Sequence, residues 1–167
     1  MSVSKTPRKS SPQRTADAWR RHNAGRILGN ALAQFESRVL ALMVQSGHAQ
    51  TRLPHIHLTR HLDLGGTRIT VLARRAAMTN AAMTELIDQC EVLGLVVREA
   101  DPADRRARIV HFTPAGRLWL AAFGRALRKA ERELREQVGE PASRVLFEAL
   151  ALYGNGVDSI GAGDAAG

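Results

Sequence analysis

The sequence predicts a mainly α-helical protein with one small β-hairpin. Apolar residues recur at spacings of three and four in long segments near both ends of the chain, which is the period of one helix face. Apolar and polar residues alternate between residues 95 and 112, on either side of a charged loop. Between these regions, two short helical segments follow each other with almost no linker. Such a pair has to cross at a steep angle, as in a helix-turn-helix.

Composition limits the class of protein. A chain of 167 residues suits one domain with a buried core. Its net charge of +8 is carried mainly by arginine, whose planar guanidinium fits phosphate and guanine, so we expect a polyanionic partner rather than a charge that only keeps the protein soluble. No stretch has about 18 uninterrupted apolar residues, and the first residues lack the apolar middle of a secretory signal. We therefore expect a cytoplasmic protein with no membrane partner, and the lone Cys90 agrees with a reducing compartment.

We expect one domain over residues 16–153 between two tails. Residues 1–15 are basic and rich in Ser, Pro and Lys, which predicts disorder, and residues 154–167 predict a flexible tail without that charge. Within the domain, a core over about residues 53–113 is flanked by long helices over about 16–46 and 114–153. These helices have more apolar positions than so small a core can bury. A second copy of the chain is the simplest partner for them.

The elements before the hairpin follow from apolar spacing and from helix breakers. The first helix is predicted over about residues 16–44, and a short one over about 54–62 with Pro54 in its first turn. Thr70 is expected to cap a helix of about two turns that runs through Ala77. Thr79 caps the next helix and Gly94 supplies its left-handed end. That second helix should bury Met83, Leu86, Ile87 and Cys90.

The hairpin and two further helices complete the order. The segment LVVREA predicts an outgoing strand, ARIVHF a returning strand, and DPADRR the loop between them. Thr113 and Pro114 predict the N-cap and first residue of a helix that keeps its spacing to about Val138. The segment GEPAS breaks that helix, and the last helix is expected from about Ala142 to Tyr153.

This order of helix-turn-helix, hairpin and FTPAG resembles the MarR family of winged helix-turn-helix regulators. The resemblance covers about residues 16–153. It implies a homodimer with interleaved terminal helices, a recognition helix in the major groove of double-stranded DNA, a wing in the minor groove and a palindromic operator. The residues that carry it are LARRAAMTNAAMTELIDQCEVLGLVVR, then Asp101, Asp104, Arg105 and Arg106 in DPADRR, then Thr113 and Gly116 in FTPAG.

The first turn of the predicted recognition helix faces outward. There Asn80 could pair with adenine through two hydrogen bonds and Ala81 could touch a thymine methyl group. Glu85 departs from the family pattern, because a carboxylate near phosphates is unfavourable unless it accepts from cytosine or pairs with an arginine. The operator sequence stays open for that reason. The expected recognition residues are Thr79, Asn80, Ala81 and Thr84.

The charged loop is the expected wing tip. A narrow, negative minor groove attracts a guanidinium on a projecting hairpin. The family pattern assigns Arg106 to the minor groove and Arg105 and Arg108 to the flanking phosphates. Asp101 is expected to accept backbone N–H bonds and Asp104 to pair with an arginine, so both support the loop. The alternative is an ordinary charged hairpin tip.

Other arginines flank the helix-turn-helix. Arg74 and Arg75 close its first helix, where they could hold phosphates and fix the register of the second helix. Arg68 and Arg98 could do the same, or could belong to surface ion pairs.

His55, His57 and His61 crowd one short helix. The spacing of His57 and His61 puts two imidazoles on one face, but no Cys or carboxylate completes a zinc set nearby in sequence, although Asp63 or His48 could in space. The family resemblance implies that this helix lines an effector pocket. Metal binding, effector binding and simple packing all stay open. Cys90 is interpreted as buried core rather than as a redox sensor.

The resulting hypothesis is a sequence-specific DNA-binding transcriptional regulator, a dimeric repressor modulated by a small-molecule effector and without a cofactor. We expect no enzyme, since no glycine-rich phosphate loop, nucleophile elbow or catalytic carboxylate pair is recognisable. Two alternatives remain. One is a winged-helix module for non-specific DNA architecture or protein contacts. The other is a metal-responsive regulator that uses the histidine cluster.

Overall fold

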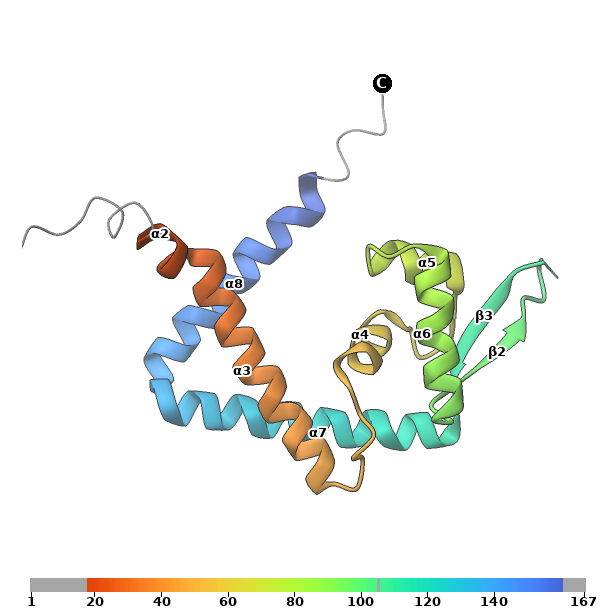
Figure 1. Ribbon diagram of the computed structural model, residues 1–167, viewed down its shortest axis with the longest axis horizontal. Helices are drawn as coiled ribbons and strands as arrows, with labels where there is room; N and C mark the ends of the chain where they lie inside the picture. The colour runs from red at the N-terminus through yellow and green to blue at the C-terminus, as the bar shows by residue number, and fades with distance from the viewer. Residues whose placement is uncertain (1–17, 105, 161–167) are drawn as a thin grey trace, which may run out of the picture. The chain divides into compact units, whose positions relative to one another are not determined.

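The computed structural model describes residues 18–104 and 106–160 (Figure 1). The chain divides after Ser37 into two compact units. The predicted tail over residues 1–15 lies outside the described residues. The predicted fold class, helices with a small antiparallel wing, is confirmed. The elements in order are α2 (Ala18–Arg21), α3 (Ala24–Gln45), α4 (Leu53–His61), β1 (Thr67–Arg68), α5 (Ile69–Arg75), α6 (Asn80–Val92), β2 (Val96–Ala100), β3 (Arg108–Phe112), α7 (Pro114–Val138) and α8 (Glu140–Ile160).

The first unit contains α2 and the start of α3, where one continuous helix was expected. Asn23 interrupts it. Its Oδ1 accepts a hydrogen bond from the backbone N–H of Arg26 (2.9 Å), and its Nδ2 donates to the carbonyl oxygen of Trp19 (2.8 Å). An asparagine in this position ends one helix and caps the next, because its side chain replaces the missing backbone partners.

The second unit has one core, and its buried apolar side chains come from the end of α3, from α4, α5 and α6, from the hairpin and from α7. Trp119 of α7 lies at its centre, and its Nε1 donates to the hydroxyl of Thr51 (2.9 Å). A bidentate ion pair between Arg38 and Glu133 (2.5 and 2.7 Å) ties the end of α3 to α7. The other large buried side chains are Val39, Met43, Leu58, Leu72, Met83, Ile87 and Val110.

By length and composition alone, α3 is apolar enough to cross a membrane. Its last turns lie in the core of the second unit, where Val39, Leu42 and Met43 are buried. This burial accounts for the apolar character of the last turns of α3, whereas Ile27, Leu28 and Leu32 earlier in the helix are exposed.

The wing is a three-stranded antiparallel sheet in the order β1-β3-β2. The predicted outgoing and returning strands are confirmed, and in the hairpin Val96 pairs with Phe112 and Ala100 with Arg108. The third strand, β1, was not predicted. It has only two residues, of which Thr67 pairs with Val110, and a strand that short leaves no periodicity to detect.

The helix-turn-helix begins two residues earlier than expected. Arg68, not Thr70, precedes the first helical residue of α5, because residues 67 and 68 are held in the sheet. The other predicted caps are confirmed. Thr79 accepts from the N–H of Ala82 (3.2 Å), Thr113 accepts from the N–H of Gly116 (2.9 Å), and Gly94 has a φ of 67°.

The two last helices differ from the prediction at their junction and at the end of the chain. α7 ends at Val138 as expected, but α8 restarts at once at Glu140 after Gly139, whose φ is 88°. α8 also continues past Tyr153 to Ile160, so residues 154–160 are helical rather than a flexible tail. A glycine inside a helix costs about 1 kcal/mol relative to alanine, so the glycines within residues 154–160 weaken α8 without ending it.

Candidate nucleic-acid interface

The first turn of α6 forms an exposed polar surface. Thr79, Asn80 and Ala81 are all exposed, and the hydroxyl of the half-buried Thr84 donates to the carbonyl oxygen of Asn80 (2.8 Å). The opposite face of α6 is buried through Met83, Leu86, Ile87 and Cys90. The four residues expected to reach base edges therefore lie together, with the amide of Asn80 as the longest polar side chain among them.

The wing loop is built around Asp101, which is buried. Its Oδ1 accepts from the backbone N–H of Ala103 (2.8 Å), and its Oδ2 accepts from the guanidinium of Arg68 (2.6 and 2.5 Å). These N–H donors, with that of Ala103 contributing most, hold the pKa of the Asp101 carboxyl below its usual range. Asp104 accepts from the backbone N–H of Arg106 (3.0 Å), and no arginine side chain among the described residues pairs with its carboxylate.

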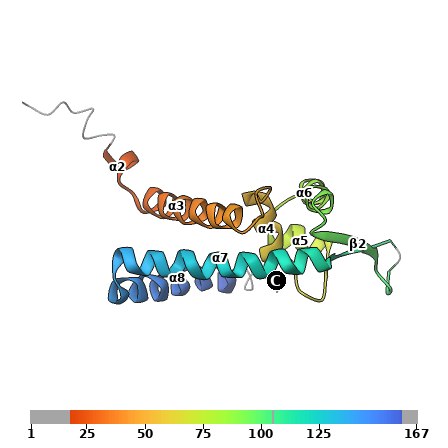
Figure 2. The same ribbon diagram turned by 90° about the horizontal axis from the view of Figure 1, so that it is seen from below.

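The tip of the wing carries cations that no nearby acid neutralises. Arg106 and Arg108 are exposed, and no carboxylate of a described residue lies within 4 Å of either guanidinium. Arg105 lies outside the described residues. Figures 1 and 2 show the hairpin projecting as an arm beyond the start of α7. Exposed guanidinium groups at the end of such an arm are available to phosphates or to a groove.

Arg98 joins α6 to the wing. Its backbone N–H donates to Oε1 of Glu91 (2.8 Å), and its guanidinium binds Oε2 of Glu91 (3.1 and 2.5 Å) and the carboxylate of Asp88. Asp88 and Glu91 both belong to α6, whereas Arg98 lies in β2. Arg98 is therefore a member of an ion-pair network rather than a free cation for phosphates.

A second ion pair joins the wing to the other helix. Arg68, directly before α5, holds Asp101 at the far end of β2. We call the Arg98 and Arg68 pairs together the wing braces. They fix the hairpin to α6 and to the start of α5, so the wing tip and the first turn of α6 keep a set spacing.

The two arginines at the end of α5 differ. Nη1 of Arg75 donates to Oδ2 of Asp63 (2.8 Å) and to the carbonyl oxygen of His61 (2.9 Å). The Arg75 guanidinium, followed by the hydroxyl of Thr67, holds the pKa of the Asp63 carboxyl below its usual range. Arg74 is exposed, with no carboxylate of a described residue within 4 Å. Only Arg74 of this pair is an unneutralised cation.

The three histidines of α4 do not converge. His55 is buried and its Nδ1 accepts from the backbone N–H of Arg52 (3.2 Å), while His57 is exposed and His61 half-buried. Burial, followed by the nearby Arg52, lowers the pKa of His55, and burial followed by Arg60 lowers that of His61. Among the described residues, no three His, Cys, Asp or Glu side chains are grouped to hold a metal ion. This arrangement disfavours the metal-responsive alternative.

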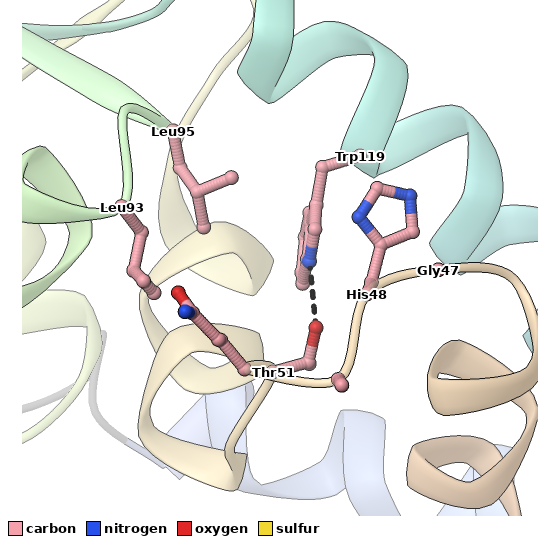
Figure 3. Close-up of a pocket in the computed structure, with 8 residues that line it drawn as sticks. Gly47, His48, Thr51, Leu93, Leu95 and Trp119 are labelled. Atoms are coloured by element: carbon pink, nitrogen blue, oxygen red, sulfur yellow. Dashed lines mark hydrogen bonds between the residues drawn. The ribbon is translucent and has the colours of Figure 1, made fainter.

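A hollow of about 310 Å³ lies beside these elements, and the sequence did not predict it. Figure 3 shows Leu93 and Leu95 on one side of it, and Trp119 and His48 on the other. Leu93 and Leu95 flank Gly94, which connects α6 to β2. The remaining lining comes from the segment between α3 and α4, which includes Thr51. None of the three predicted effector histidines lines this hollow. His55 lines a separate one of about 420 Å³ with part of α6.

Cys90 lies in the core without solvent exposure. Burial raises the pKa of its thiol to about 12, so it stays protonated at neutral pH. A thiol in that state is a poor nucleophile, in keeping with a packing role.

Two curated relatives match the chain. One is an uncharacterized HTH-type transcriptional regulator, YdgJ, of Bacillus subtilis, 27% identical over 115 residues, which are 69% of each chain. The other is the transcriptional regulator HosA of Escherichia coli, 42% identical over 60 residues, which are 36% of this chain and 44% of HosA. No family model matches the chain. The HosA match is short but stronger per residue than the longer one.

Solved structures share the fold over most of the chain. Wild-type MarR of E. coli superposes with a TM-score of 0.66 at 16% identity, covering 79% of this chain and 97% of MarR. The repressor CouR of Rhodococcus jostii, bound to a 23-mer DNA duplex, gives 0.64 at 23% identity, covering 83% and 96%. A MarR family protein of Mycobacterium tuberculosis in complex with p-aminosalicylic acid gives 0.61 at 23% identity, covering 80% and 99%. The chain therefore has the winged helix-turn-helix fold of these MarR-type transcriptional regulators.

Proposed function

We propose that this protein is a dimeric, sequence-specific DNA-binding repressor that a small-molecule effector releases from its operator. One observation carries the proposal. The exposed first turn of α6 and the unneutralised arginines of the wing tip lie on elements that the wing braces hold together. A helix turn with an amide side chain suits the major groove, and a projecting arginine suits a narrow minor groove.

The proposed role of each residue in DNA recognition follows from the chemistry of its side chain. Asn80 and Thr79 supply hydrogen bonds to base edges, and Ala81 supplies an apolar contact. Arg106 enters the minor groove, and Arg108, Arg74 and Arg105 bind phosphates. Specificity therefore depends mainly on α6, while the wing contributes affinity and the recognition of groove shape. The protein would carry out this function in the cytoplasm, where its operator is accessible.

A second copy of the chain is the proposed partner. On α8, Val145, Leu146, Leu150 and Tyr153 are exposed at spacings that place them on one helix face. In the first unit, Trp19, Ile27, Leu28 and Leu32 are exposed as well. Apolar rows of this kind are stable when buried against another chain, and two-fold symmetry would match a palindromic operator.

The hollow beside Trp119 is the proposed effector site. A ligand there would contact Leu93 and Leu95, and so would act on the connection between the recognition helix and the wing. The structure of the M. tuberculosis relative contains p-aminosalicylic acid, and that of CouR was also determined with p-coumaroyl-CoA. We infer an aromatic acid or its thioester as the effector class for this protein.

The experiment is a gel-shift and fluorescence titration of the DNA upstream of the protein's own gene. We expect preference for one palindromic site over scrambled DNA by about a thousandfold. Arg106→Ala should weaken binding and lower the salt dependence by about one released counterion. Absence of any shift at moderate salt would contradict the proposal, as would an Arg106→Ala variant that binds like the wild type. Equal affinity for operator and scrambled DNA would favour a non-specific architectural role instead.

The effector part has its own test. Aromatic carboxylates, p-aminosalicylic acid among them, should release the protein from operator DNA. His48→Ala changes the edge of the hollow and no DNA-facing residue, so it should shift the effector concentration needed for release while DNA affinity stays the same. Release that is unchanged in this variant would count against the hollow as the site.

A further inference from the structure

An arginine-rimmed groove runs along the face of α7 that is turned away from the core. Residues 117, 121, 124 and 128 lie on one side of the helix, opposite the buried Trp119, Ala122 and Ala126. Together with Leu64, which precedes β1, they border a groove of about 450 Å³, a volume typical of small-molecule sites. The groove belongs neither to the proposed DNA surface nor to the proposed effector hollow.

Its rim is positively charged and unneutralised. Arg117, Arg125 and Arg128 border it, and no carboxylate of a described residue lies within 4 Å of them. The sequence of α7 contains no Asp or Glu before Glu131. Elsewhere in the described chain several arginines are matched with acids, as Arg38 is with Glu133 and Arg98 with Glu91. Three guanidinium groups without a carboxylate partner, within about 16 Å of helix, favour an anion with more than one charge.

Its floor is apolar and shallow because small residues form it. Ala121 and Gly124 leave space beneath the rim, and Leu64 closes one side. Nη2 of Arg117 donates to the carbonyl oxygen of Leu64 (3.2 Å), which holds that side chain across one end. Nη1 of Arg128 lies 3.5 Å from where a Cβ of Gly124 would be, so the Arg128 guanidinium lies over the glycine. Guanidinium planes beside a bare apolar floor suit a flat ring as well as phosphate.

We propose that this groove binds a small organic phosphate with a flat aromatic body, the chemistry of a nucleotide. The operator duplex is a less suitable occupant. α7 begins against Leu95, at the end of α6 that is opposite the base-reading turn, and the 13-residue α6 is about 20 Å long. This proposal does not depend on DNA binding by the first turn of α6.

Calorimetric titration of the full chain with ADP at fixed ionic strength tests the proposal. We expect one ADP per chain, at least tenfold weaker binding of pyrophosphate, and no detectable binding of adenosine. Arg117→Gln combined with Arg128→Gln should weaken ADP binding at least tenfold. The matched control is Arg60→Gln combined with Arg144→Gln, which removes the same charge from exposed positions outside the groove and should change binding less than twofold.

A charge-neutral variant separates the groove from general electrostatics. Gly124→Leu fills the floor, where only the movable Arg128 side chain lies within 4 Å of the new Cβ, and should also weaken ADP binding at least tenfold. Thermal unfolding and sedimentation of each variant establish that fold and mass are retained. No ADP binding by the wild type overturns the proposal, as does equal loss in the control pair. The proposal is also overturned if the arginine variants lose only operator affinity, because the groove would then be a DNA contact. A changed mass of these variants overturns it as well, because the groove would then be an interface between chains.

Discussion

Gly116 shows how one residue sets the position of a whole helix. A Cβ at this position would lie 1.8 Å from the carbonyl oxygen of Leu95, and a backbone atom cannot rotate away. We expect Gly116→Ala to push α7 away from β2 and to lower the free energy of unfolding by about 3 kcal/mol. Urea unfolding measures this change. Gly124→Ala is the control, because its Cβ would meet only the end of the Arg128 side chain at 3.5 Å. If both variants are equally stable, the close approach at Gly116 does not position α7.

The carboxyl group of Asp101 should make stability depend on pH in the acid range. Its pKa is lower in the folded protein than the value of about 3.9 for an unfolded chain, so the carboxylate stabilises the fold above that value. The stabilisation is lost as pH falls through the lowered folded-state pKa. We expect Asp101→Asn to be less stable than the wild type at pH 7, with a difference that shrinks as the pH falls below about 4. Denaturant melts at several pH values measure it. A gap that is constant with pH, or an equal effect of Asp104→Asn, would contradict this role.

At the scale of single residues, the sequence predicts the features that depend on residues close by along the chain. The caps at Thr79 and Thr113 follow from side-chain chemistry within one turn of the helix, and so does the left-handed Gly94. The roles of Arg68 and Arg98 could not be decided, because a guanidinium suits phosphate and carboxylate alike. What decides between them is a partner that only the folded chain brings close. For Arg68 that partner is Asp101, 33 residues along the chain.

At the scale of the elements, the wing braces lead to a prediction that distinguishes a structural role of Arg98 from a phosphate contact. Arg98→Gln removes the link between β2 and α6 but no cation from the DNA surface. We expect operator affinity to fall at least tenfold, while the slope of affinity against salt stays that of the wild type. Arg106→Gln should instead lower that slope by about one. Fluorescence anisotropy at four salt concentrations separates the two. A reduced slope in Arg98→Gln would make Arg98 a phosphate contact.

The sequence analysis missed the features that span too few residues to show a repeating apolar pattern. β1 has two residues, and the break between α2 and α3 is one asparagine inside an otherwise helical pattern. The hollow beside Trp119 was missed for a related reason. Its lining comes from the segment after α3, from the end of α6 and from α7, and no local pattern joins these three. The long helices and the hairpin, by contrast, repeat their periods often enough to be recognised.

For the whole molecule, the exposed apolar face of α8 decides how many chains form the working unit. The sequence predicts a partner because the long terminal helices have more apolar residues than the core can bury. In the single chain, Val145, Leu146, Leu150 and Tyr153 of α8 are exposed. Burying such a face contributes about 25 cal/mol for each Å² of apolar surface removed from water. Leu146→Lys combined with Leu150→Lys would place charges in that surface. We expect this double variant to sediment as a monomer.

The same variant should bind DNA differently from the wild type. A monomer presents one recognition helix, so its affinity for a full palindrome should fall to that for a half-site, while its affinity for an isolated half-site changes little. Glu148→Lys, on the other side of α8, is the control and should leave both mass and operator affinity unchanged. Sedimentation and anisotropy with full and half operators measure the two effects. If the double variant stays a dimer, or the wild type is a monomer at micromolar concentration, then α8 is not the dimer surface and the palindrome argument loses its physical basis.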